Sequence, residues 1–402
     1  MLKAGFAKHK ITPQKMMTLA GFDRRTQPAQ GILEDLYVTV LALQNGDETP
    51  FLLCSFDLLG VDRTLCEKVR QALPLPPERV WVCATHTHGA PRGGFSGGIS
   101  QDDAYISDLI RACKAAALGA IDDLLPTQAF WGETTVEGVA SLRDVPREMS
   151  VYAMPLFSLR LMRERDTITF LHIQCHPTVL DEHNLCYSRD LPGGIVGENI
   201  IFTNGACADV STRFTRKESS PAERDRLGMR IKTAWDRIEY QTDADFGKKI
   251  QPISLELALP YGSALQGEER LRLLEELQRQ AAACVDKAAL RELDACIAVL
   301  ERGDRVLPQT RTVTVAACDL GSRLLLALPF EAAQADGVQL EREASSLCGK
   351  PTHLICYSGG YDGYLPHVQM GVNYQDLATG YLPEARDLIW KGVLDCAANA
   401  VK

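Results

Sequence analysis

The chain has 402 residues, of which 46% are hydrophobic and 24% charged, as in an ordinary globular enzyme. The net charge is -9 without a polybasic segment, so we expect neither nucleic-acid binding nor stable membrane association. The thirteen cysteines are scattered singly without a CxxC pair, and the N-terminus has no signal-peptide core, so the sequence predicts a cytoplasmic protein without disulfides.

In chain order, the pattern predicts strands at 36–43 and 51–57, a helix at 61–73, a strand at 80–85, a helix at 101–121, and strands at 128–141, 151–162, 167–175 and 200–204. After a mainly helical stretch at 216–305, it predicts strands at 311–321 and 323–330, a helix at 331–347, a strand at 353–358 and a helix at 383–401. A turn-rich link makes the first two strands a hairpin, and Ser100, Asp102 and Asp103 are typical of a helix start. The class is therefore α/β or α+β, with mixed β-sheets flanked by helices.

The stretch 216–305 is predicted to be a helical excursion from the sheet core. Its longest periodic segment, 264–302, breaks near Val285–Asp286, which indicates two antiparallel helices. Such an excursion can form a lid, a substrate wall or a subunit interface.

Two histidines follow the strand at 80–85 in the sequence Thr85-His86-Thr87-His88. In an extended segment, residues two apart point to the same side, so His86 and His88 can reach one site. Both can ligate a metal, or one can ligate while the other transfers protons. The alternative is that both are polar residues of a loop.

Other candidates also lie at the ends of predicted strands. His176 precedes Pro177, where a strand stops, whereas His172 lies inside the apolar run and is expected to be a core residue. Ser211 can be a nucleophile, a hydrogen-bond donor or a helix cap, and the cap or turn interpretation is favoured. The G-x-S-x-G pattern of classical serine hydrolases is absent. Glu331 opens a helix, where the dipole favours an acid in any case. The loop 357–374 has four tyrosines and several glycines, which is more typical of a site than of a core.

Five motifs occur in a fixed order: THTHGAP at 85–91, HPT at 176–178, NGACADVS at 204–211, LPFE at 328–331 and GYLP at 363–366. Together with AGFAKHKITP and GILEDLYVTVLALQ near the N-terminus, this order resembles the neutral ceramidase superfamily. The resemblance extends to about Asp387. It implies that 1–402 is a single ceramidase-like catalytic domain with the helical excursion at 216–305, and without the family's C-terminal immunoglobulin-like domain.

The resemblance also implies the site. One Zn²⁺ would be held by residues from four motifs: His86, His176, Glu331 and Tyr364. His88 would transfer protons, Arg143 would be an active-site arginine, Tyr374 would help to hold the substrate carbonyl, and Ser211 would belong to the site. The sequence departs from the family pattern at Leu142, at Gly89-Ala90 and at Thr212.

The implied activity is that of a zinc-dependent amidohydrolase, which cleaves an amide with metal-activated water. The expected partner is a small-molecule, polar amide rather than membrane ceramide, because the chain is acidic and has no evident lipid-docking helix. The alternatives are a true ceramidase, a metal-dependent lyase or isomerase, and a non-catalytic binding protein on the same fold.

Overall fold

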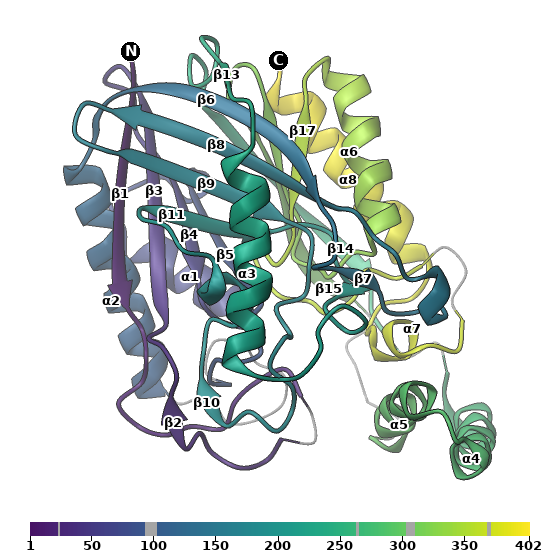
Figure 1. Ribbon diagram of the computed structural model, residues 1–402. Helices are drawn as coiled ribbons and strands as arrows, with labels where there is room; N and C mark the ends of the chain where they lie inside the picture. The colour runs from purple at the N-terminus through teal and green to yellow at the C-terminus, as the bar shows by residue number, and fades with distance from the viewer. Residues whose placement is uncertain (23–24, 93–102, 263–264, 303–309, 368–370) are drawn as a thin grey trace.

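The computed structural model describes the whole chain except residues 23–24, 93–102, 263–264, 303–309 and 368–370. Two β-sheets pack against each other, and helices cover their outer faces (Figure 1). This mixed α/β architecture confirms the predicted class. The predicted helix start at Ser100 and Asp102 lies outside the described residues; the helix itself, α2, spans Asp103–Asp122.

The larger sheet has strands in the order β11 (Ile200–Asn204), β9 (Thr167–Ile173), β8 (Met154–Arg163), β6 (Leu125–Val136), β1 (Leu2–Lys10), β3 (Tyr37–Asn45), β4 (Phe51–Phe56) and β5 (Val80–Ala84), and β13 (Gln241–Thr242) pairs with β6. The predicted hairpin is confirmed as the antiparallel pair β3–β4, in which Leu41 faces Leu53. Each end of this sheet is a parallel pair, β4 with β5 and β9 with β11. Within each of these two pairs, the carboxyl ends of both strands therefore lie at the same edge of the sheet.

The smaller sheet has the order β14 (Gln251–Pro260), β15 (Thr310–Asp319), β16 (Leu324–Ala327) and β17 (Thr352–Ile355). Helices α6 (Gln334–Cys348) and α8 (Glu384–Ala400) cover its outer face, while α2, with α1 (Arg63–Gln71) against it, covers the larger sheet. The remaining described helices and strands are α3 (Pro221–Asp236), α4 (Gly267–Ala283), α5 (Lys287–Glu301), α7 (Tyr374–Ala378), β2 (Gly31–Ile32), β7 (Ser141–Leu142), β10 (Cys186–Tyr187) and β12 (Val210–Ser211), together with 3₁₀ turns at Pro77–Arg79, Arg147–Met149 and Leu191–Gly194. None of the described helices is long and apolar enough to span a bilayer.

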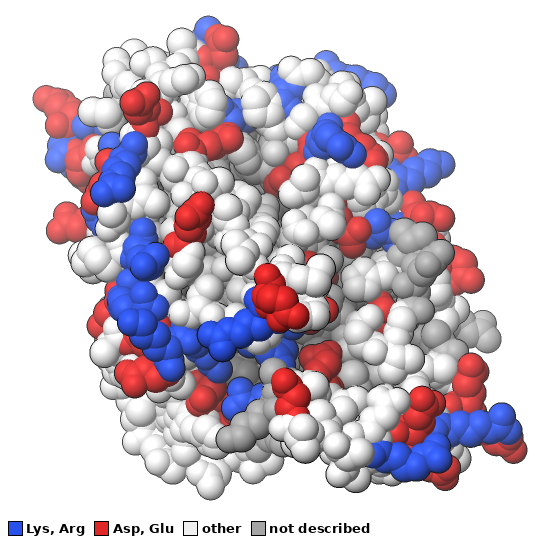
Figure 2. All heavy atoms as spheres, turned by 45° about the vertical axis from the view of Figure 1, so that its right-hand side comes forward, with Lys and Arg blue, Asp and Glu red and all other residues white. Residues whose placement is uncertain are grey.

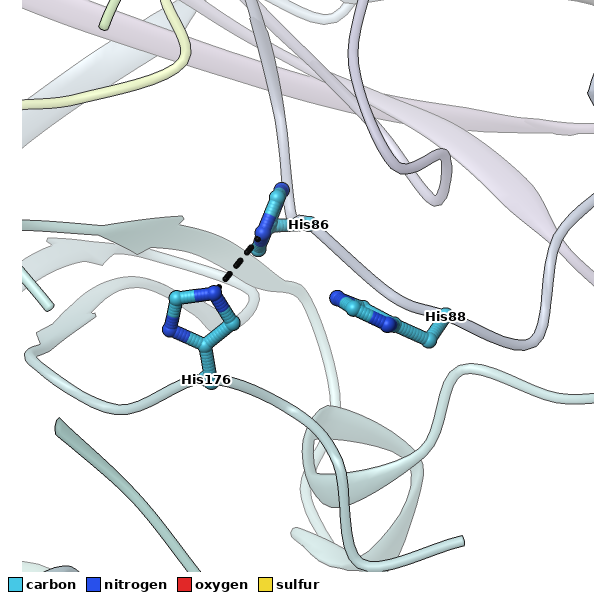
Figure 3. A group of neighbouring side chains, drawn as sticks. All are labelled: His86, His88 and His176. Carbon is cyan, nitrogen blue, oxygen red and sulfur yellow. Dashed lines mark hydrogen bonds between the residues drawn. The ribbon is translucent and has the colours of Figure 1, made fainter. Parts of the chain in front are cut away.

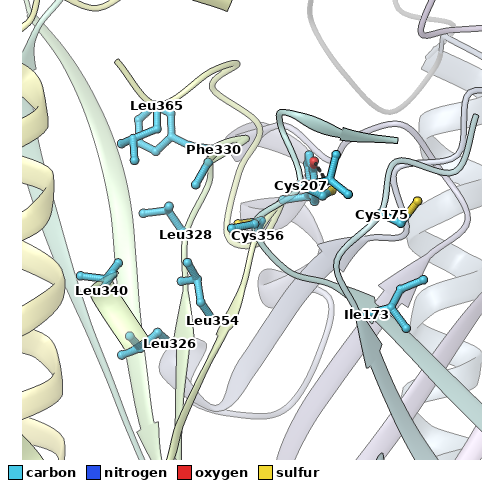
Figure 4. Close-up of a cluster of buried hydrophobic side chains, with 14 of the residues drawn as sticks. Ile173, Cys175, Cys207, Leu326, Leu328, Phe330, Leu340, Leu354, Cys356 and Leu365 are labelled. Carbon is cyan, nitrogen blue, oxygen red and sulfur yellow. Dashed lines mark hydrogen bonds between the residues drawn. The ribbon is translucent and has the colours of Figure 1, made fainter. Parts of the chain in front are cut away.

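Apolar side chains fill the space between the sheets and under the helices. Phe51, Trp81 and Leu325 belong to the cluster between the two sheets. A second cluster continues from α6 and the smaller sheet to the loops that follow β9, β11 and β17, where Cys175, Cys207 and Cys356 lie (Figure 4). These loops therefore rest on a packed core, which restricts their movement.

Several two-residue strands and two long ones, β1 and β14, were missed by the sequence analysis, and β14 corrects the helical excursion. β14 pairs with β15 over its whole length, so the prediction that 216–305 is largely helical is wrong at 251–260. Its outward side chains are exposed because it is an edge strand, and flanking helical segments hid its alternation. β1 was missed because three of its nine residues are lysines. The break near Val285–Asp286 is confirmed, since it separates α4 from α5.

His172 lies in the core of β9, as predicted. Its side chain is 4% exposed, and its Nδ1 is 2.9 Å from the Thr203 hydroxyl. Burial lowers the pKa of this imidazole to about 4, so the ring is neutral in the folded protein at pH 7.

This shift predicts a stability change with pH. Between pH 6.5 and 4 the unfolded chain binds a proton at His172 and the folded chain does not, so stability falls as the pH falls through this range. Between pH 6.5 and 4.5 the loss from this group is about 2–3 kcal/mol. We expect His172→Asn, whose amide can replace Nδ1, to reduce the slope of unfolding free energy against pH in denaturant titrations. An unchanged slope would contradict the assignment.

Candidate metal centre and active site

The candidate residues follow the carboxyl ends of strands from both sheets. His86 and His88 follow β5, His176 follows β9, and Glu331 follows β16. All three strands have a parallel neighbour, and their carboxyl ends lie on one side of the molecule, because the residues that follow them meet there. The loops are joined there, because the Glu331 amide donates to the Gly363 carbonyl and Ala84 N–H donates to Tyr357.

Three atoms that could bind a metal ion converge at this point. His86 Nε2 lies 3.1 Å from His176 Nε2 (Figure 3). Glu331 Oε2 lies 3.4 Å from the first nitrogen and 3.1 Å from the second. All three side chains are at most 2% exposed. The site is therefore a buried triangle of two nitrogens and one oxygen.

Backbone carbonyls fix the tautomers of both imidazoles. His86 Nδ1 is 2.7 Å from the Leu59 oxygen, and His176 Nδ1 is 2.6 Å from the Cys207 oxygen. A carbonyl can only accept, so each Nδ1 must carry the hydrogen and each neutral ring has its lone pair on Nε2. Burial also lowers the pKa of His176 to about 4, which keeps that ring neutral at pH 7.

These atoms fit a metal ion. Two lone pairs and a carboxylate oxygen face one another, and Glu331 Oε2 has no hydrogen-bond partner among the described residues. Such an arrangement needs a positive charge at its centre. A tetrahedral zinc site with bonds of about 2.0–2.1 Å separates neighbouring ligands by about 3.3–3.4 Å, close to the observed triangle. Because second hydrogen bonds already orient the rings, the triangle is also preorganised.

The two histidines of the first motif reach one site by a different backbone path than predicted. His86 has φ 66°, in the left-handed region, so the segment is not extended there. Its ring stacks on Tyr357, whose φ of 56° is also left-handed, with 4.0 Å between the ring centroids. Strained residues of this kind persist where the surrounding structure holds them, and they are frequent at functional sites.

His88 lies beside the triangle, but its ring has no hydrogen-bond partner among the described residues. Both of its ring nitrogens are buried. One of them lies within 4.8 Å of a ring nitrogen of each of His86 and His176, so it is also within the group that can hold a metal. Burial, followed by the neighbouring imidazoles, holds the pKa of His88 well below its usual value. Phe22 packs edge-on against the ring, 4.9 Å away between centroids.

The structure brings the other predicted residues to the same cavity. Tyr364 is 9% exposed, and its hydroxyl is 3.4 Å from Nη2 of Arg143. Tyr374 begins α7, and its ring meets that of Tyr364 edge-on at 5.7 Å. Ser211 also faces the cavity, but its Oγ accepts from the Arg213 N–H, and among the described residues this hydroxyl makes no hydrogen bond to a histidine ring or a carboxylate. That contact favours the turn interpretation over the nucleophile.

Two tyrosines of this site were not assigned from the sequence. Tyr361 donates to Glu331 Oε1 at 2.5 Å and thereby orients the carboxylate. Tyr357 stacks on His86. The tyrosine-rich loop was recognised as site-like, but the sequence alone does not show which of its tyrosines reaches the acid.

A cavity of about 1230 Å³ opens over the triangle. Its inner wall includes His86, His88, His176 and Glu331, and its outer wall includes residues of α4, α5 and α7. The helical hairpin α4–α5 is therefore part of the cavity wall.

Comparison with known proteins identifies the fold. The chain matches the crystal structure of neutral ceramidase from Pseudomonas aeruginosa with a TM-score of 0.75 at 16% identity, over 99% of this chain and 74% of the other. It also matches a ceramidase complexed with C2, with a TM-score of 0.74 at 14% identity, over 99% of this chain and 75% of the other. No protein-family model matches the sequence, and no curated protein matches it. The chain thus has the neutral ceramidase fold at very low sequence identity.

The triangle predicts one bound metal ion per chain. We expect His176→Ala to lower metal affinity by at least ~100-fold without unfolding, because it removes a preorganised ligand. The matched control is His183→Ala, since His183 is an exposed histidine seven residues further along. Elemental analysis after dialysis against a weak chelator measures the metal content. Retention of metal in His176→Ala, or a metal-free folded wild type, would contradict the site.

Proposed function

We propose that this chain, which has the neutral ceramidase fold, is a zinc-dependent hydrolase that cleaves an amide with water to give a carboxylic acid and an amine. The observation that carries the proposal is the buried triangle of His86, His176 and Glu331 beside the unpartnered imidazole of His88. The fold supports the reaction class, because the substrate named for its structural neighbours, ceramide, is an amide.

His86, His176 and Glu331 would hold the zinc, with Tyr364 as the fourth protein ligand. Nitrogen and oxygen ligands of this kind suit zinc. When bound, zinc supplies Lewis-acid chemistry, which lowers the pKa of water towards ~7 and polarises a carbonyl oxygen.

His88 is the proton-transfer residue of the proposal. Because its lowered pKa keeps the ring neutral, it can accept a proton from water as the water oxygen bonds to the carbonyl carbon. It then donates that proton to the amide nitrogen as the carbon–nitrogen bond breaks. The ring ends neutral, so one turnover consumes one amide and one water.

Donors on the opposite side can stabilise the oxyanion. Arg143 presents a guanidinium next to Tyr364, and Tyr374 lies beyond them in the same cavity. One well-placed donor of this type contributes about 3–4 kcal/mol to catalysis. Ser211 serves the site as a turn residue that holds the loop of His176, with which it forms a bridge.

The cavity favours a polar amide over ceramide. Charged side chains line its outer part: Arg213, Arg216, Arg270, Arg272, Arg291, Arg302, Glu269, Glu276, Glu292 and Asp294. Figure 2 shows a band of Lys and Arg on one face of the molecule, with Asp and Glu beside it. Apolar residues such as Leu273 and Leu377 also line the cavity, but an acyl chain buried against the charged groups would desolvate them without compensation. At about 1230 Å³ the cavity is nevertheless larger than the usual ~300–1,000 Å³ of small-molecule sites. It can therefore accommodate an amide with a large acyl or amine group.

We place the protein in a reducing compartment, the cytoplasm. All thirteen cysteines are free thiols, and most of them are buried. Buried free cysteines act as small apolar residues, which is the usage of cytosolic proteins.

The direct test is product release from matched amides. Zinc-loaded protein is incubated with N-acetyl amino acids and with a short-chain N-acylsphingosine in micelles, and free amine is quantified. We expect faster cleavage of the polar amides. Faster cleavage of the sphingolipid would favour a true ceramidase, and no acid product from any amide despite bound zinc would favour a lyase, an isomerase or a binding protein.

His88→Gln separates proton transfer from metal binding. We expect kcat to fall by about 10²–10⁴-fold, because the proton acceptor is lost, while one zinc per chain is retained. Loss of zinc in this variant would instead make His88 a metal ligand. Zinc content and kcat are measured on the same preparation.

A further inference from the structure

The hairpin α4–α5 is attached to the active site by a small apolar cluster. Leu277, Cys296 and Leu300 are each at most 4% exposed and form its centre. Tyr374 and Leu377, both from α7, pack against that centre. In Figure 1 the hairpin lies apart from the sheets, with α5 next to α7. The apolar contact of the hairpin with the protein is thus made through the short helix that carries Tyr374.

Glu292 of α5 adds a polar connection at the same place. Its Oε1 accepts a hydrogen bond from the Tyr374 backbone N–H at 3.1 Å. Its Oε2 lies 3.9 Å from Nη1 of Arg213, two residues after Ser211. Neighbouring Arg291 lies 3.9 Å from Glu182, in the loop after His176. α5 therefore contacts three separate segments around the cavity.

Tyr374 in turn faces the catalytic residues. Its ring meets Tyr364 edge-on, and Tyr364 contacts Arg143. The next residue, Gln375, donates to Asp144, which adjoins Arg143. Movement of α7 would therefore displace the phenol of Tyr374 relative to the substrate carbonyl, and a displacement of about 1 Å can cost ~100-fold in rate.

We infer that Glu292 is a positioning residue for Tyr374, and that the α4–α5 hairpin is a fixed wall of the active site. The second part concerns structure alone, whereas the catalytic consequence rests on the proposed amide hydrolysis. The hairpin thereby couples substrate contact at the outer cavity to the geometry at the metal centre. Its own interior is too small to stabilise it without the contact to α7.

Hydrogen–deuterium exchange tests the physical link without any substrate. In Glu292→Ala we expect faster exchange in the peptide 371–379, because the acceptor of the Tyr374 N–H is lost. Glu292→Gln should restore protection, since its amide oxygen can still accept. Glu275→Ala is the matched control, because Glu275 is an exposed acid on α4 that does not line the cavity. Unchanged exchange in Glu292→Ala would overturn the inference whatever the enzyme cleaves.

A double-mutant cycle tests the catalytic consequence. Alone, Glu292→Ala should lower kcat about tenfold with little change in KM, a smaller loss than the ~100-fold expected for Tyr374→Phe. Added to Tyr374→Phe, it should lower kcat less than about twofold, because residues that act as a unit are not additive. Equal losses in both backgrounds would show that Glu292 acts independently of Tyr374 and would overturn its positioning role. Failure to hydrolyse any amide would contradict the proposed function but leave the exchange result to decide this inference.

Discussion

The central physical constraint is the mutual approach of two imidazole lone pairs and a carboxylate oxygen inside the protein. His86, His176 and Glu331 hold these atoms 3.1–3.4 Å apart, without water-exposed surface to screen them. Desolvated acceptors at such distances repel unless a cation lies between them. The rings cannot avoid this repulsion by moving the proton to Nε2, because each Nδ1 hydrogen is already donated to a backbone carbonyl. The local structure is therefore suited to hold a metal ion, and the packed core around it keeps these atoms in place.

The rigid sheets hold these three atoms close together despite their mutual repulsion. Each candidate ligand lies just beyond a strand that has a parallel neighbour. Backbone hydrogen bonds also join the loops that carry these residues to neighbouring segments. The left-handed conformation of His86 persists because Tyr357, itself left-handed, stacks against it and is fully buried. Strain at the site is thus balanced by packing behind it, as is common where geometry matters for chemistry.

The sequence predicted which candidate residues lie close together better than it predicted their backbone geometry. The separate strand-end motifs indicated which side chains to consider, because strand ends collect in α/β folds. The prediction that His86 and His88 reach one site assumed an extended backbone. The backbone is not extended there, because His86 has a φ of 66°. β14 was missed because most of its residues are exposed or half-buried and it lies between helical segments. The bond from Tyr361 to Glu331 could not be predicted, since it depends on how the loops after β16 and β17 meet in space.

In the proposed hydrolase, different parts of the chain carry out the chemistry and select the substrate. The metal triangle depends on long-range strand pairing, so changing it requires changing the core. The outer cavity depends on α4 and α5, whose few buried residues contact the body mainly at α7. Surface positions of that hairpin can change charge without disturbing the sheets, so new substrates can be accommodated there at little cost in stability. Glu292 is the exception, because its carboxylate binds the Tyr374 N–H. A substitution there would, by the inference above, also move Tyr374 and affect the proposed reaction.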